Sequence, residues 1–98
     1  MKNAFLSYAL AKENHEKLLK IEKRDLLCLI EEQIKEAIEK GVYKTQFSYW
    51  TERDNIIEEL KEYAIEFLNN LGYHVKAIAE EGYHCSRLIL IIYFKRED

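Results

Sequence analysis

Apolar positions recur at helical spacing in two stretches near the start of the chain. In residues 4–22 they form two groups separated by the polar run 12–17, which predicts a helix with an interrupted apolar face. In residues 25–40 they recur without a gap opposite a charged face, which predicts a second amphipathic helix. Asp25 is a candidate N-cap of this helix, although one unbroken helix also fits the pattern. Gly41 is expected to end it in the left-handed conformation.

After Gly41 the apolar period changes from helical to two. Residues 43–49 alternate between apolar and polar side chains and predict a half-buried strand. Thr51 is then expected to cap a third helix at residues 52–71, with Asp54 at its third position and Gly72 beyond its end. Residues 73–80 and 84–95 predict two further strands joined by a tight turn near Glu81 and Gly82.

The last strand differs from the other two because it is apolar on both faces. One face carries Leu88, Leu90, Ile92 and Phe94, and the other carries Ile89, Ile91 and Tyr93. Such a strand belongs in the middle of a sheet. We therefore predict an α+β fold, three helices packed on a three-stranded antiparallel sheet, with element order α-α-β-α-β-β and strand order 1-3-2.

The length of 98 residues predicts a single domain. Residues 25–95 are expected to form its core, and residues 1–24 an N-terminal helix that either docks on the sheet or projects as an arm. If the helices cover one face of the sheet, the other face presents the bulky side chains of the last strand. Exposed apolar patches usually mark interfaces, so this face is expected to form a homodimer or to be covered by the first helix.

Charge is nearly balanced, with 15 basic and 18 acidic residues and a net charge of −3. Nucleic-acid binders are usually basic or carry a basic stripe, and the strands offer only Lys44, Lys76, Arg87 and Lys95 beside their aromatic residues. We therefore do not expect a nucleic-acid partner. Residues 25–66 hold eleven acidic and five basic residues. This acidic surface could compete for a basic groove, or it could be two solvated helix faces.

Candidate chemistry is limited to two cysteines and three histidines. With a two-residue turn at 81–82, His74 lies far along the hairpin from His84, too far to share a metal ion with it. Cys28 is expected to pack as a small hydrophobe, and Cys85 to lie in the core opposite Ile78. We therefore expect no metal ion, no cofactor and no catalytic residue, and so no enzymatic activity.

The longest apolar run, residues 88–94, is far shorter than the ~20 residues of a membrane-spanning helix. The cysteine content predicts no disulfide framework, and no targeting segment is recognised. These features favour the cytoplasm and no membrane partner.

Aromatic residues and carboxylates supply the candidate contacts with a protein partner. Trp50 is placed where a strand meets a helix, either as a packing anchor or as a hot spot for binding. The candidate contact residues are Tyr49, Trp50, Glu58, Glu59, Glu62 and Tyr93.

Two stretches carry a resemblance to known proteins: IEEQIKEAIEKG at residues 30–41, followed by a strand, and NNLGYHV at residues 69–75, followed by a terminal hairpin. They resemble small uncharacterised proteins that phages and prophages of low-GC bacteria encode, over residues 25–95. The resemblance implies a phage or mobile-element origin, and hence the host cytoplasm. It implies no particular activity for any residue.

These observations favour a non-enzymatic accessory protein that binds a host or phage protein and inhibits, for instance, a host defence or another host process. We expect a homo-oligomer, with a dimer favoured. One alternative is a virion structural or assembly protein, which would form a large defined oligomer. Another is a module that binds a small ligand or nucleotide at a dimer interface.

Overall fold

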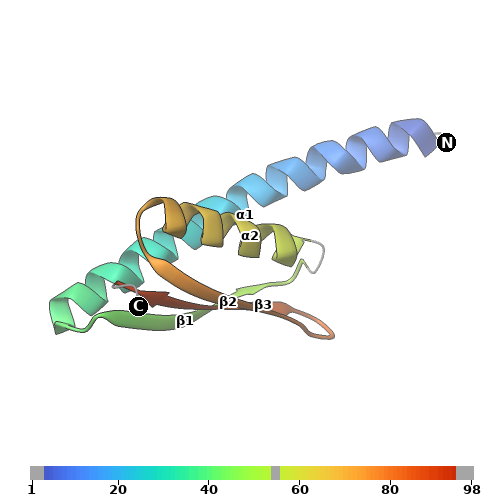
Figure 1. Cartoon of the computed structure of the whole chain (residues 1–98). Helices are drawn as coiled ribbons and strands as arrows, with labels where there is room; N and C mark the ends of the chain where they lie inside the picture. The colour runs from blue at the N-terminus through green and yellow to red at the C-terminus, as the bar shows by residue number, and fades with distance from the viewer. Residues whose placement is uncertain (1–3, 54–55, 95–98) are drawn as a thin grey trace.

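The computed structural model describes residues 4–53 and 56–94. Its α+β fold contains two helices and three strands (Figure 1). In chain order these elements are α1 (Ala4–Lys40), β1 (Lys44–Thr51), α2 (Ile57–Asn70), β2 (His74–Glu81) and β3 (Ser86–Tyr93).

The prediction of three helices is wrong, because the first two form the single helix α1 of 37 residues. The chain contains no proline, and its three glycines lie after the helical region, so nothing breaks the helix between residues 21 and 25. The buried residues Glu22, Leu26 and Ile30 lie on one stripe that crosses the expected boundary. Asp25 lies inside the helix, exposed to solvent, and is not an N-cap.

Both helices end at a glycine, as the sequence predicts. Gly41 and Gly72 have positive φ angles of 72° and 93°. The amide of Val42 donates to the carbonyl of Ala37 at 3.1 Å, and that of Tyr73 to Leu68 at 3.0 Å. These bonds define the Schellman motif, in which the left-handed glycine lets the chain turn back on the last helical carbonyls.

The expected start of the helix α2 is wrong. Thr51 is the last residue of β1, and its hydroxyl accepts a hydrogen bond from the amide of Arg53 at 3.1 Å. The bond closes a turn, because residues 52 and 53 that follow are not helical. The N-cap of α2 is Ile56, which makes no side-chain capping bond. Asp54 lies outside the described residues.

The sheet confirms the predicted topology. Its strand order is β1-β3-β2, and both pairs are antiparallel. Alternate residues of β3 are fully buried, beginning with Ser86 and continuing with Leu88, Leu90 and Ile92. These side chains pack with Leu26 and Ile30 of α1 and with the apolar stripe of α2, so both helices cover the same face of the sheet (Figure 1). Cover of the opposite face by the first helix is therefore not what the structure shows.

The predicted two-residue turn between β2 and β3 is wrong. Glu81 pairs with Ser86, so four residues, Gly82 to Cys85, form the loop, and the amide of Gly82 donates to the carbonyl of Cys85 at 2.9 Å. The longer loop moves the pairing of β2 with β3 by four positions. Because four is an even number, every side chain stays on its expected face. Cys85 lies in the loop, only partly buried, and not opposite Ile78.

The molecule is elongated, with principal extents of 59 × 28 × 24 Å and a Cα radius of gyration of 16.1 Å. A compact domain of this length would have a radius of gyration of about 13 Å. The difference comes from the N-terminal part of α1, which projects well beyond the sheet and α2 (Figure 1).

Candidate protein-contact surfaces

The side of the sheet opposite the helices is a regular surface of twelve side chains, which we call the open face. Strand pairing arranges them in four rows, each running from β1 through β3 to β2. The rows are Lys44–Tyr93–His74, Gln46–Ile91–Lys76, Ser48–Ile89–Ile78 and Trp50–Arg87–Glu80.

The two central rows of the open face hold three isoleucines and three polar side chains, and the two end rows carry aromatic rings and charged groups. Ile89 and Ile91 are half-buried by their neighbours, whereas Ile78 is 48% exposed and Trp50 is 59% exposed. No other element of the described chain lies over these side chains (Figure 1). The face therefore presents apolar surface that binding could remove from water.

The cations of the open face lie against its aromatic rings. The ammonium groups of Lys44 and Lys76 lie 5.8 and 5.7 Å from the centroid of the Tyr93 ring. The guanidinium of Arg87 lies 5.2 Å from the centroid of Trp50 and also pairs with Glu80, to which its Nε donates at 2.9 Å. Cation–π contacts of this kind hold long side chains close to the surface. The open face thus carries three cations and one carboxylate, whereas the whole chain is acidic.

The structure distributes the candidate contact residues over three places. Trp50 and Tyr93 lie on the open face, in the rows at its opposite ends. Tyr49 lies on the other side of the sheet, packed against the core. The three carboxylates are exposed on α2, on the helical side of the molecule: Glu58, Glu59 and Glu62. Glu59 bonds the His15 imidazole at 3.0 Å, which ties α2 to α1.

A buried carboxylate, Glu22, joins α1 to the end of β1. Its side chain is only 10% exposed and bonds the Tyr49 hydroxyl, the Thr51 hydroxyl at 3.4 Å and the Arg53 guanidinium at 2.8 Å. Burial, and then the hydrogen bond to Glu22 and its negative charge, raise the pKa of the Tyr49 phenol well above its ordinary value of 10.0. A phenol held protonated in this way is poorly suited to acid–base catalysis near neutral pH. The cluster satisfies a buried charge and fixes the helix to the strand.

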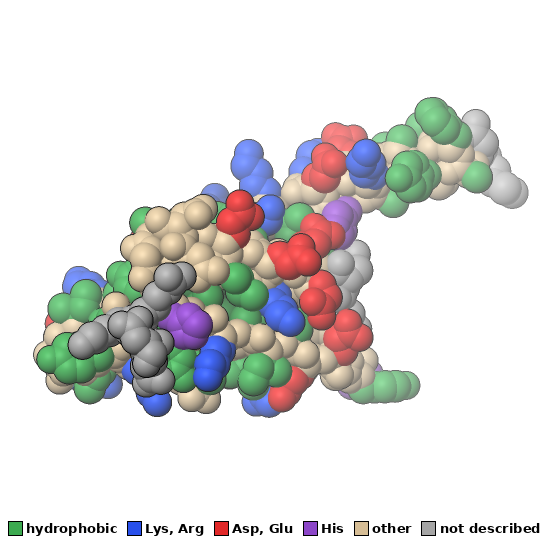
Figure 2. Space-filling view, in the orientation of Figure 1, with side chains coloured by type: hydrophobic (Ala, Val, Ile, Leu, Met, Phe, Trp, Pro, Cys, Tyr) green, Lys and Arg blue, Asp and Glu red, His purple; other side chains and the backbone are tan. Residues whose placement is uncertain are grey.

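The N-terminal part of α1, residues 4–14, is a helical arm that extends beyond the body of the protein. Phe5 is 81% exposed, Tyr8 is 68% exposed and Leu6 is 44% exposed. Figure 2 shows hydrophobic side chains gathered at the outer end of this arm, separated from the body by charged residues. Exposed aromatic side chains on a projecting helix are a second apolar surface.

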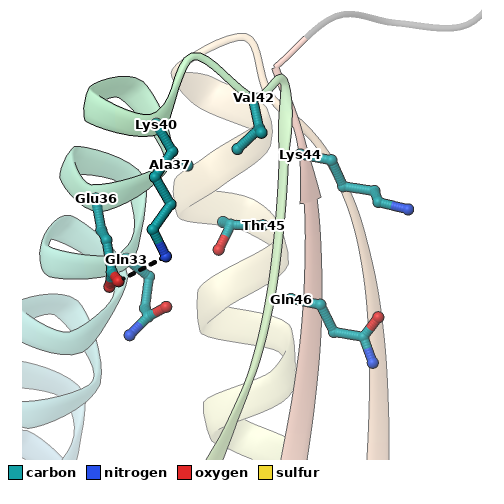
Figure 3. A pocket seen from close by; sticks show the side chains of 8 residues that line it. All are labelled: Gln33, Glu36, Ala37, Lys40, Val42, Lys44, Thr45 and Gln46. Carbon is teal, nitrogen blue, oxygen red and sulfur yellow. Dashed lines mark hydrogen bonds and ion pairs between the residues drawn. The ribbon is translucent and has the colours of Figure 1, made fainter.

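A hollow lies between the last turns of α1 and β1 (Figure 3). Its lining residues are Gln33, Glu36, Ala37, Lys40, Val42, Lys44, Thr45 and Gln46. The two charged residues on the α1 side of the hollow, Lys40 and Glu36, form an ion pair with each other at 2.9 Å. In Figure 3 Thr45 points toward the helix, whereas Lys44 and Gln46 point away to the open face. The hollow therefore brings no free acid, base or nucleophile together.

Residues 4–53 and 56–94 contain no group of three His, Cys, Asp or Glu side chains placed to hold a metal ion. Both cysteines are free thiols, and Cys28, expected to be packed, is exposed on α1. Within the same residues, no helix is both long and apolar enough to span a membrane.

Comparison of the chain with family models, with curated proteins and with solved structures gave no match in any of the three.

Sequence reasoning identified Trp50 and Tyr93 but missed the groups that gather around them. Lys44, Lys76 and Arg87 are far apart in the sequence and become neighbours only through the pairing of both edge strands with β3. The period-two alternation was the signal that could have placed them with Trp50 on one face. Phe5 and Tyr8 were also missed, because a stripe of apolar residues in the sequence does not indicate whether another element of the protein packs on it.

Proposed function

We propose that the protein is a non-enzymatic binding protein that contacts another protein through its arm, residues 4–14. The observation that carries the proposal is the exposure of Phe5 and Tyr8 at the end of a helix that projects from the body. Burying one such side chain against a partner would contribute about 1.5–3 kcal/mol.

The spacing of the exposed side chains supports binding in a groove. Phe5, Tyr8 and Ala9 stand at positions i, i+3 and i+4, so they share one side of the helix. An amphipathic helix with anchors at this spacing binds by laying its apolar side into a hydrophobic groove of the partner. The arm continues the 37-residue helix α1, so its helical nucleus is already supplied by the part of α1 that packs on the body.

The chemistry of the described residues supports a role in binding. The buried carboxylate Glu22 is engaged by three donors, and the histidines and free thiols are not assembled into a site. The biological setting rests on the sequence resemblance alone: an accessory protein of a phage or mobile element that acts in the host cytoplasm on a host or phage protein, for instance one of a host defence complex.

Photo-crosslinking tests the arm directly. We would place p-benzoylphenylalanine at position 5 or 8 of the full chain. The matched control is position 7, which is exposed on the opposite side of the same helical turn. Irradiation in lysate of the bacterium that carries the gene should give one discrete adduct from position 5 and from position 8. Tyr8→Ser should weaken the adduct from position 5, and Phe5→Ser should weaken the adduct from position 8. Equal labelling from position 7, or no discrete adduct, would contradict the proposal.

A further inference from the structure

The open face carries apolar side chains that no element of the described chain covers. Its central strand presents Ile89 and Ile91, and the edge strand β2 adds Ile78, which is 48% exposed. Apolar patches of this kind on small proteins usually mark an interface. The charges on its rim indicate which occupant fits it.

The two ends of the face are chemically different, and each end complements the other. One end is the row Lys44–Tyr93–His74, and the other is the row Trp50–Arg87–Glu80. The first row offers a cation, a ring and an imidazole. The second offers, strand by strand, a ring, a cation and a carboxylate. Such a surface can pair with itself if its ends are exchanged.

Two twofold arrangements can place one open face on another. With the axis along the strands, each row meets the same row of the second copy, so that Arg87 lies on Arg87 and His74 on Lys44. With the axis across the strands, the first row meets the last. Tyr93 then meets Arg87, Lys44 meets Trp50 and His74 meets Glu80. In the middle rows Ile91 meets Ile89, and Lys76 meets Ile78, along which its methylene groups can lie while its ammonium stays at the edge. The second arrangement pairs cations with rings and Glu80 with an imidazole, whereas the first sets Arg87 against Arg87.

We propose that the open face binds the open face of a second copy of this chain, with the twofold axis across the strands. The two sheets pack about 10 Å apart with the ~30° rotation that sheet twist imposes. Three strands of eight residues cover roughly 400 Å² in each copy at the usual strand spacings. The total of about 800 Å² lies below the range of stable interfaces and within that of weak, transient ones, so the dimer should dissociate at micromolar concentration or above.

Sedimentation equilibrium of the full chain between about 1 and 500 µM tests the contact. The wild-type protein should change from monomer to dimer over this range. Ile91→Lys places a charge at the centre of the face and should stay monomeric at every concentration. The matched control is Ile38→Lys, the same change at a residue of α1 that is 64% exposed and away from the face, and it should dimerise like the wild type. Circular dichroism verifies that both variants are folded.

A charge exchange tests the orientation. His74→Glu places a carboxylate opposite Glu80 of the second copy, and Glu80→Lys places an ammonium opposite His74. Each variant alone should dimerise about tenfold more weakly or worse, because like charges or unmatched donors meet. An equimolar mixture should recover dimers that contain one chain of each kind, since the introduced carboxylate of one chain would then face the introduced ammonium of the other. With the axis along the strands, His74→Glu would instead face Lys44 and dimerise more strongly.

Several outcomes would overturn the proposal. These are a monomeric wild type at 500 µM, a dimer that Ile91→Lys leaves intact, and a ring or larger assembly. An equimolar mixture of His74→Glu and Glu80→Lys that forms no mixed dimers would also overturn it. Binding of a fluorescein-labelled 12-nucleotide oligouridine to a monomeric wild type, with loss in Lys44→Ala and Lys76→Ala, would assign the face to nucleic acid instead. The arm takes no part in this contact, so a dimer should persist in a chain without residues 1–14 even if the arm binds no partner.

Discussion

Glu22 is the residue whose environment most constrains the relation of α1 to the sheet. A carboxylate taken out of water is costly unless donors surround it, and here Tyr49, Thr51 and Arg53 supply them. All three donors come from the end of β1 and the residues after it. The cluster therefore fixes where along α1 the first strand lies, and the position of the arm follows from it.

Tyr49→Phe should destabilise the protein by about 1–3 kcal/mol at pH 7, the usual effect of removing a hydrogen bond to a charged group. The difference should shrink above pH 10. The pKa of Tyr49 is raised by folding, so its contribution is complete below the unfolded value of 10.0 and is lost as pH rises toward the folded value. Urea unfolding at pH 7 and pH 10.8 measures both effects.

The matched control for this change is Tyr43→Phe, because Tyr43 is 79% exposed. It should alter the free energy of unfolding by less than about 0.5 kcal/mol at both pH values. A Tyr49→Phe variant as stable as the control at pH 7 would show that the phenol does not hold the helix to the strand.

Gly82→Ala should destabilise the hairpin by about 1–3 kcal/mol, as overpacking usually does. A Cβ on Gly82 would stand 2.4 Å from the carbonyl oxygen of Cys85, inside the four-residue loop, and a backbone atom cannot move aside easily. Gly41→Ala is the comparison, since its Cβ would meet nothing within 4 Å and only the positive φ is strained. Thermal unfolding should rank Gly82→Ala below Gly41→Ala, and the reverse order would contradict the clash.

Among the elements, strands and helix ends could be predicted because their signals are local. Alternation in residues 43–49 and the doubly apolar run 88–94 were sufficient to place β1 and to make β3 central. Gly41 and Gly72 ended both helices because left-handed φ angles favour glycine.

The features that could not be predicted depend on tertiary contacts. The polar run 12–17 looks like a gap between helices, but it marks the place where α1 leaves the body and has little to pack against. The loop Gly82 to Cys85 was predicted to be a two-residue turn, because the sequence alone does not define how many residues of β2 and β3 pair. Alternation could have placed Lys44, Lys76 and Arg87 on one face, but which side chains they neighbour there follows only from the register.

A chain that begins at His15 should keep the stability of the full protein to within about 1 kcal/mol. Residues 4–14 are exposed apart from the partly buried Leu10, whereas His15 bonds Glu59 and is retained. The urea m value should also change little, because it follows the surface that unfolding exposes. A chain that begins at Leu27 is the control, since it loses Glu22 and Leu26 and should not fold cooperatively. Loss of cooperative unfolding in the chain that begins at His15 would show that the arm supports the core.

For the whole molecule, the two proposed contacts use separate surfaces. The open face lies on one side of the sheet, and α1 with its arm lies on the other. A dimer formed through the open faces would therefore leave both arms free to bind. Two linked binding segments can raise the apparent affinity for a partner with two sites by ~10²–10⁴-fold.

Small-angle scattering of the monomeric Ile91→Lys variant should show an elongated particle, consistent with the long axis of 59 Å. Removing residues 1–14 should shorten the maximum dimension by about 16 Å, because eleven of these residues are helical and each adds ~1.5 Å. Helical circular dichroism should fall by about a fifth, because eleven of the helical residues are removed, out of 37 in α1 and 14 in α2. An unchanged maximum dimension with the same loss of helix would mean that the arm packs against the body in solution, and its aromatic residues would then not be available to a partner.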